Sequence, residues 1–127
     1  MGLKSYHELI VWQKSIDIVG KIYSVTQGFP KDELYALTNQ IRRSAVSIPS
    51  NIAEGQARKA TKEFLNFISI AQGSRAELET QLIIANRLRY IDDNKTEQLL
   101  SDLAEIAKML HALSAKLKAQ TNETADH

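Results

Sequence analysis

The chain has 127 residues and no cysteine, so it is long enough for one domain with a modest core and holds neither disulfides nor thiolate metal ligands. No apolar run approaches the roughly 18 residues of a membrane span, and residues 1–10 lack the pattern of a secretory signal. We therefore expect a cytoplasmic protein without a membrane partner. The net charge of +1 is unevenly distributed, because residues 40–62 carry five basic residues against Glu54 alone, whereas residues 91–127 are acidic.

The first predicted helix begins at Ser5, which forms a capping-box pattern with Glu8. It ends at the segment Gly28–Pro30, because glycine and proline both favour a helix end. Apolar residues recur at alternating spacings of three and four, which predicts one face in the core. That face comprises Leu9, Trp12, Ile16, Val19 and Tyr23.

The second predicted helix starts at Pro30 and ends at Gly55, a plausible stop signal. Pro49 lies inside its apolar pattern, where a proline removes one backbone donor and crowds the carbonyl four residues earlier. Because Ile52 keeps the helical spacing, we expect a kink near Pro49 rather than a helix end. The apolar face comprises Leu34, Leu37, Ile41, Ala45, Ile48 and Ile52.

Two further helices are predicted, one over residues 61–89 and one capped by Asn94 with Glu97 at the third position. The core face of the third is Phe64, Ile68, Ala71, Leu78, Leu82 and Ala85. Gly73 interrupts this helix, and the close approach of another helix is the expected reason. The fourth helix has the heptad-like seam Leu99, Leu103, Ile106, Leu110, Leu113 and Leu117. Residues 119–127 are a polar tail that we expect to fray.

Four helices joined by short loops predict an all-α fold, an antiparallel up-down-up-down four-helix bundle over residues 5–118. Several apolar residues remain outside the four core faces. They are Val11, Ile18, Ile22, Val25, Ile70, Ile83 and Ile84. This surplus predicts an exposed apolar patch and hence self-association. The alternative is a wide bundle core in a monomer.

Five stretches of the chain resemble a known family. They are Tyr6–Gln13, Phe29–Glu33, Leu37–Gly55, Lys62–Leu65 and Gly73–Ile83. The chain resembles the four-helix-bundle proteins encoded in intervening sequences of bacterial 23S ribosomal RNA genes, over about residues 5–118. The accessory variability protein of diversity-generating retroelements shares that fold and also contacts a reverse transcriptase. The resemblance implies a bacterial, cytoplasmic homopentamer with a ring-like shape. Nucleic-acid binding is proposed for the relatives, but no activity is established for most of them.

Basic residues are the candidate nucleic-acid contacts: Arg42 and Arg43 in the second helix, and Arg58, Lys59 and Lys62 at the following turn. As phosphate contacts they would bind RNA or DNA with little sequence preference. The alternative is a solvated face with internal pairs, and for the two arginines we favour a salt bridge to a carboxylate on a neighbouring helix. No aromatic residue interleaves with these residues in the sequence, so the stacking signature of single-strand binders is missing.

No enzymatic chemistry is predicted, and we expect neither a cofactor nor a metal. The three histidines are scattered, and none has the Glu-x-x-His spacing of a di-iron bundle. Glu79 follows Arg75 by four residues, which favours an ion pair on the helix surface.

Two classes of function remain. The leading hypothesis is a non-catalytic oligomeric bundle that binds RNA or DNA or serves as a scaffold. The alternative is a protein-binding or structural homo-oligomer with no nucleic-acid role. The uneven charge favours the first class, whereas the near-neutral total and the missing aromatic residues favour the second.

Overall fold

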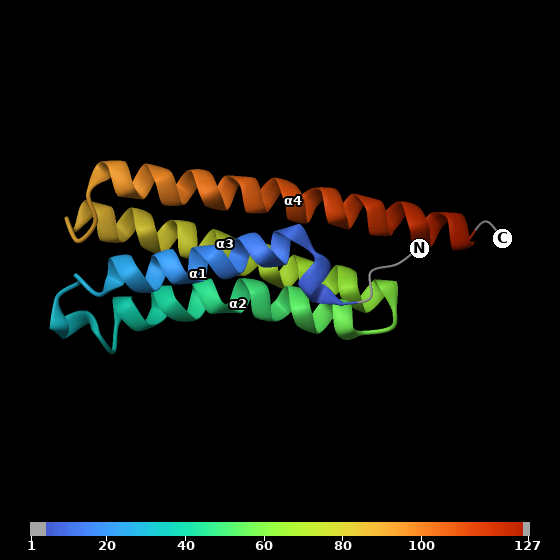
Figure 1. The fold of residues 1–127 in the computed structure, drawn as a ribbon, viewed down its shortest axis with the longest axis horizontal. Helices are drawn as coiled ribbons and strands as arrows, with labels where there is room; N and C mark the ends of the chain where they lie inside the picture. Colours follow the sequence, from blue (N-terminus) through green and yellow to red (C-terminus); the bar gives the residue numbers. More distant parts are fainter. Residues whose placement is uncertain (1–4, 126–127) are drawn as a thin grey trace.

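The computed structural model describes the backbone of residues 5–125 and the side chains of residues 5–121. Four α-helices and two short 3-10 turns make up this part of the chain, which contains no strand, so the all-α prediction is confirmed (Figure 1). The elements are η1 (Tyr6–Glu8), α1 (Ile10–Thr26), η2 (Lys31–Glu33), α2 (Leu37–Ala57), α3 (Thr61–Arg87) and α4 (Asp93–Ala125).

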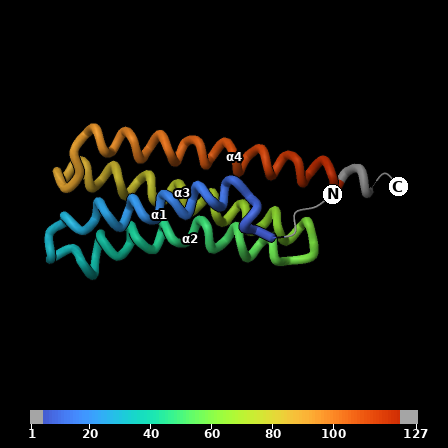
Figure 2. The backbone as a smooth tube through the Cα atoms, viewed as in Figure 1, coloured from blue at the N-terminus to red at the C-terminus, as the bar shows by residue number. Residues whose placement is uncertain are grey.

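The four α-helices lie along the long axis of the molecule, and the chain reverses direction at each connection (Figure 1). α2 packs against α1 and α3, and α4 packs against α3 and α1. The C-terminal end of α4 extends past the turn between α2 and α3 (Figure 2). α4 also continues through most of the segment that the sequence assigns to a polar tail.

Each of the four α-helices contributes large side chains to one buried core. The largest fully buried ones are Ile18, Ile22, Ile41, Ile48, Ile52, Ile68, Leu78, Leu82, Leu99, Leu103, Ile106 and Leu110. The predicted core faces of α2 and α3 are confirmed, except that Leu34 is exposed and Leu37 and Phe64 are half-buried. In α4 the first four positions of the seam are buried, while Leu113 and Leu117 are half-buried.

The predicted core face of α1 is confirmed only in part, because Leu9 is buried and Trp12 and Val19 are half-buried, while the other two positions are exposed. Ile16 and Tyr23 are 43% and 41% exposed, whereas Ile18 and Ile22 are buried. The buried face also carries two hydroxyl groups, Ser15 and Thr26, which interrupt its apolar pattern. Both hydroxyls donate hydrogen bonds to carbonyl oxygens of the preceding helical turn, at 2.8 and 2.7 Å, so their burial leaves no polar group unsatisfied. The structure therefore exposes much of the face that the sequence assigns to the core.

The starts of the helices also differ from the prediction. Ser5 accepts a hydrogen bond from the backbone of His7 and caps η1 rather than α1. α2 begins at Leu37, where the Glu33 carboxylate accepts from the backbone N–H at 3.3 Å. α4 is capped by Asp92 rather than Asn94, because the Asp92 carboxylate accepts from the N–H of Lys95 at 2.7 Å. Each carboxylate satisfies a backbone donor that the helix leaves free.

A tyrosine links the two connections at the same end of the molecule. The Tyr90 hydroxyl donates a 2.9 Å hydrogen bond to the Glu33 carboxylate. This hydrogen bond, together with desolvation, raises the pKa of Tyr90 above its ordinary value of 10.0. Because the folded state holds the phenol proton more tightly, the hydrogen bond stabilises the fold below pH 10.0, and this stabilisation disappears as the pH rises through the folded-state pKa.

The glycines in α2 and α3 play different parts from those predicted. Gly55 does not end α2, which continues to Ala57. A Cβ atom at Gly55 would lie 2.6 Å from the Cβ of Phe67 and 3.0 Å from a ring carbon of Phe64, so the two helices approach closely there. A Cβ at Gly73 would meet nothing within 4 Å. Close helix approach therefore explains Gly55 and not Gly73.

Pro49 is buried within α2, and the kink expected near it stays a prediction.

Replacing Gly55 with alanine should lower the free energy of unfolding by about 1–3 kcal/mol, because Phe67 must move to admit the methyl group. Gly73→Ala is the matched control and should raise it by up to about 1 kcal/mol, since it adds helix propensity without a clash. Urea unfolding followed by circular dichroism measures both. Equal effects of the two substitutions would contradict the close contact at Gly55.

Replacing Leu110 with alanine should lower the free energy of unfolding by about 2–5 kcal/mol, because its side chain is fully buried. Lys108→Ala on the same helix is the control, because Lys108 is exposed and its removal should change stability by less than about 0.5 kcal/mol. Thermal and urea unfolding of the two variants test this difference.

Candidate nucleic-acid interface

The five predicted basic residues do not lie on one surface. Arg42 and Arg43 lie near the start of α2, while Arg58 and Lys59 follow its end. Sixteen residues of helix separate Arg42 from Arg58, which corresponds to about 24 Å at 1.5 Å per residue. The structure therefore divides the candidates into an arginine pair on α2 and a basic turn between α2 and α3.

Arg58 has internal partners. Its guanidinium lies 4.0 Å from the Glu54 carboxylate, 3.6 Å from the Glu63 carboxylate and 5.1 Å from the centre of the Phe67 ring. The two glutamates offset its charge, so Arg58 is the weakest candidate for a phosphate contact in the basic turn. Lys59 beside it is exposed.

Lys62 lines a groove of about 540 Å³ between α3 and α4, together with Lys118. Among the residues that the structure describes, no carboxylate lines this groove, which we call the α3–α4 groove. Its other polar residues are Asn66, Ser69, Gln72, His111 and Ser114. Two lysines with surrounding amide and hydroxyl groups can contact the phosphates of a nucleic acid.

Lys118 is a candidate that sequence reasoning missed. Lys62 and Lys118 are equally far along the chain from Tyr90, which lies in the turn between α3 and α4. Two helices that run back along each other bring such residues to the same level. The register of the helical hairpin is thus the signal that would have found Lys118, although it lies outside the basic segment of residues 40–62.

Arg42 is held by α1. Its Nε donates a 2.9 Å hydrogen bond to the Thr26 hydroxyl, and its guanidinium lies 4.6 Å from the centre of the Tyr23 ring. The predicted salt bridge is therefore not formed within the described residues, and a hydroxyl and an aromatic ring hold Arg42 instead. Arg43 is exposed and lines a hollow with Tyr23 and Tyr35. The fold thus brings aromatic rings to the arginine pair, although the sequence does not interleave them.

Other polar side chains of the described residues form structural contacts. Within the described part of the chain, no cluster of three or more His, Cys, Asp or Glu residues is placed to hold a metal ion. Arg75 and Glu79 form the predicted surface ion pair at 2.7 Å. Ser47 hydrogen-bonds with Ser74 at 2.7 Å and joins α2 to α3. None of the helices between residues 5 and 125 combines the length and apolarity needed to span a bilayer.

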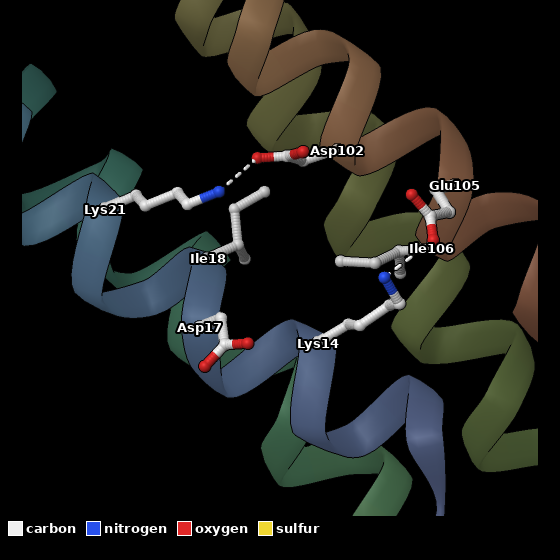
Figure 3. Close-up of a pocket in the computed structure, with 7 residues that line it drawn as sticks. All are labelled: Lys14, Asp17, Ile18, Lys21, Asp102, Glu105 and Ile106. Carbon is white, nitrogen blue, oxygen red and sulfur yellow. Dashed lines mark hydrogen bonds and ion pairs between the residues drawn. The ribbon is translucent and has the colours of Figure 1, made fainter.

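A small cavity between α1 and α4 is lined by lysines and carboxylates (Figure 3). The ammonium of Lys14 lies 2.7 Å from the Glu105 carboxylate, and that of Lys21 lies 2.8 Å from Asp102. The hydrogen bond to Glu105 and its negative charge raise the pKa of Lys14. The cavity measures about 70 Å³, room for a few water molecules, and four of its five charged side chains form the two ion pairs. It is therefore a structural seam rather than a ligand site.

The fold defines a small all-α protein. A family model described as 23S rRNA-intervening sequence protein matches residues 7–112, and the chain belongs to this family. The resemblance found in the sequence is thereby confirmed.

One solved structure is similar over most of both chains. It is a protein of unknown function from the S23 ribosomal protein family of Bacteroides thetaiotaomicron VPI-5482. The two chains share 28% sequence identity and a TM-score of 0.75, over 83% of this chain and 98% of that chain. No curated protein matches this sequence.

Replacing Arg42 with glutamine should lower the free energy of unfolding by about 1–2 kcal/mol, because α1 and α2 are then no longer joined through Tyr23 and Thr26. Retention of RNA or DNA should change little. Arg87→Gln, at an exposed position of α3, is the control and should leave stability within about 0.5 kcal/mol. Identical unfolding curves for the two variants would mean that Arg42 is not a structural residue.

Proposed function

We propose that the protein is a non-catalytic, cytoplasmic, antiparallel up-down-up-down four-helix bundle that associates with further copies of itself and binds RNA or DNA. The α3–α4 groove carries this proposal, because Lys62 and Lys118 line it and no carboxylate from residues 5–121 does. The exposed Lys59 of the basic turn adds a further positive charge. The name of the family refers to sequences within 23S ribosomal RNA, which supports RNA as the first probe.

The contacts proposed here are to phosphates rather than bases. No aromatic residue lines the α3–α4 groove, so bases would have no ring on which to stack. Lysine is a flexible point charge that suits a phosphate backbone of any sequence. Binding by one subunit would be weak and strongly salt-dependent. In an oligomer each copy repeats the groove, so weak contacts add through multivalency. The resemblance implies that the oligomer is a pentamer.

The alternative function is a protein-binding or structural homo-oligomer, a scaffold for another protein with no nucleic-acid role. The internal pairing of Arg58 favours it, as do the large apolar side chains exposed on α1, α2 and α3. The two functions differ in the role of Lys62 and Lys118, which contact phosphates in the first function and have no binding role in the second.

Replacing both Lys62 and Lys118 with glutamine should weaken binding to RNA and duplex DNA alike. The slope of log affinity against log salt should fall by about 0.9 for each duplex phosphate that the variant no longer neutralises, and by about 0.7 for each phosphate of a single strand. Fluorescence anisotropy with mixed-sequence probes, from about 50 mM salt upward, measures both the affinity and this slope.

The matched control is the double substitution Lys31→Gln and Lys108→Gln, which removes the same charge at exposed positions outside the α3–α4 groove. It should leave the salt dependence close to that of the parent protein. No binding of the parent protein to either probe at about 50 mM salt, where electrostatic binding is strong, would reject nucleic-acid binding and leave the scaffold function.

A further inference from the structure

A long apolar groove runs between α1 and α2 on the outside of the bundle. It consists of two hollows, of about 250 and 530 Å³, that share Val46. Ile16 lines the first hollow, while Tyr23, Leu34 and Tyr35 line the second. We call these hollows together the α1–α2 groove.

The side chains of the α1–α2 groove are unusually exposed for their type. Tyr35 is 91% exposed, and Leu34, Ile16, Tyr23 and Val46 are each between 39% and 46% exposed. Contiguous apolar side chains of this size mark an interaction surface rather than scattered surface residues. Arg42 and Arg43 also line the groove, and no carboxylate of the described residues does. A complementary partner is therefore apolar with a negative charge.

The same chain carries such a surface on α3. Ile70, Glu77 and Ile84 are spaced by seven residues, and Leu88 follows four after Ile84. Ile70, Ile84 and Leu88 are 44%, 44% and 50% exposed. Positions at this spacing lie along one side of a helix, so these four residues form a single stripe, the α3 stripe. Glu77 makes no ion pair within the described residues.

Gly73 lies on the same side of α3, between Ile70 and Glu77. Nothing within its own subunit fills the space of a side chain there, so no internal contact accounts for a glycine in mid-helix. A glycine at this exposed position leaves room for another molecule beside the helix. The α3 stripe thus combines apolar anchors and one unpaired acid, with a glycine between them.

We propose that the α3 stripe of one copy packs into the α1–α2 groove of the next copy. Ile70, Ile84 and Leu88 fill the apolar hollows, and Glu77 pairs with Arg43, which makes no ion pair within the described residues of its own subunit. This interface rests on the self-association in the proposed function and is independent of the α3–α4 groove. Because the two surfaces differ, the contact is heterologous, and repetition closes a ring or extends a filament.

A heterologous contact has a signature that a two-fold contact lacks. Ile84→Lys damages the stripe, and Ile16→Lys damages the groove. Each variant alone should have the monomer mass of 14.3 kDa in light scattering after gel filtration, while the parent protein is larger. A 1:1 mixture of the two should have twice that mass, because one intact stripe then meets one intact groove. Ile10→Lys is the control, since Ile10 is 59% exposed on α1 but does not line the groove.

The charge pair has its own test. Arg43→Glu and Glu77→Arg should each weaken association roughly tenfold or more, and the combined variant should recover to within about threefold of the parent. Circular dichroism checks that each variant keeps its helices, since all of these positions are exposed.

The outcomes separate the interface from the self-association on which it rests. A parent protein that stays at 14.3 kDa at high micromolar concentration would reject the self-association itself. Variants that keep the mass of the parent would reject this interface and leave self-association standing. Groove variants that no longer bind RNA while keeping their mass would show that the groove holds nucleic acid, which also overturns the interface.

Discussion

At Gly55 the backbone of α2 meets the side chain of Phe67 on α3, and no residue with a Cβ atom fits there unless Phe67 moves. The hydroxyls of Ser47 and Ser74, 2.7 Å apart, make a second contact farther along the same two helices. Together the contacts set the register of α2 against α3. A short connection then suffices between the helices, and Arg58 lies over the Phe67 ring. The position of the basic turn therefore depends on the close helix contact at Gly55.

The core faces of α2, α3 and α4 could be predicted because polar residues occupy most of the opposite faces. In α1 both faces are apolar, and the sequence favours the uninterrupted one through Trp12 and Ile16. The protein buries the other face, whose Ser15 and Thr26 hydroxyls find carbonyl partners within the helix. The spacing of apolar residues alone does not reveal that a buried hydroxyl has a hydrogen-bond acceptor within its own helix. The glycines mislead for a related reason, because only the packed structure shows which of them meets a neighbour.

The candidate site is predicted only in part, because charge along the chain does not report distance in space. Lys62 is found from the sequence, whereas Lys118 joins it only through the hairpin of α3 and α4. For Arg42 the sequence suggests a partner inside the bundle, and counting charges suggests that this partner is a carboxylate. The partner is instead the Tyr23 ring of α1. An uncharged ring does not enter a count of charges, so this contact could not be predicted in that way.

The seam between α1 and α4 is packed less closely than the other contacts of the bundle. It contains charged pairs and hollows where the other helix contacts contain apolar side chains. The pairs of Lys14 with Glu105 and of Lys21 with Asp102 are partly exposed, so water and ions can replace them at low cost. A second hollow, of about 340 Å³, adjoins Lys21 and Asp102. Local opening of a protein follows its least costly boundary. In amide hydrogen exchange, α1 would then separate from α4 in openings that leave α2 and α3 joined.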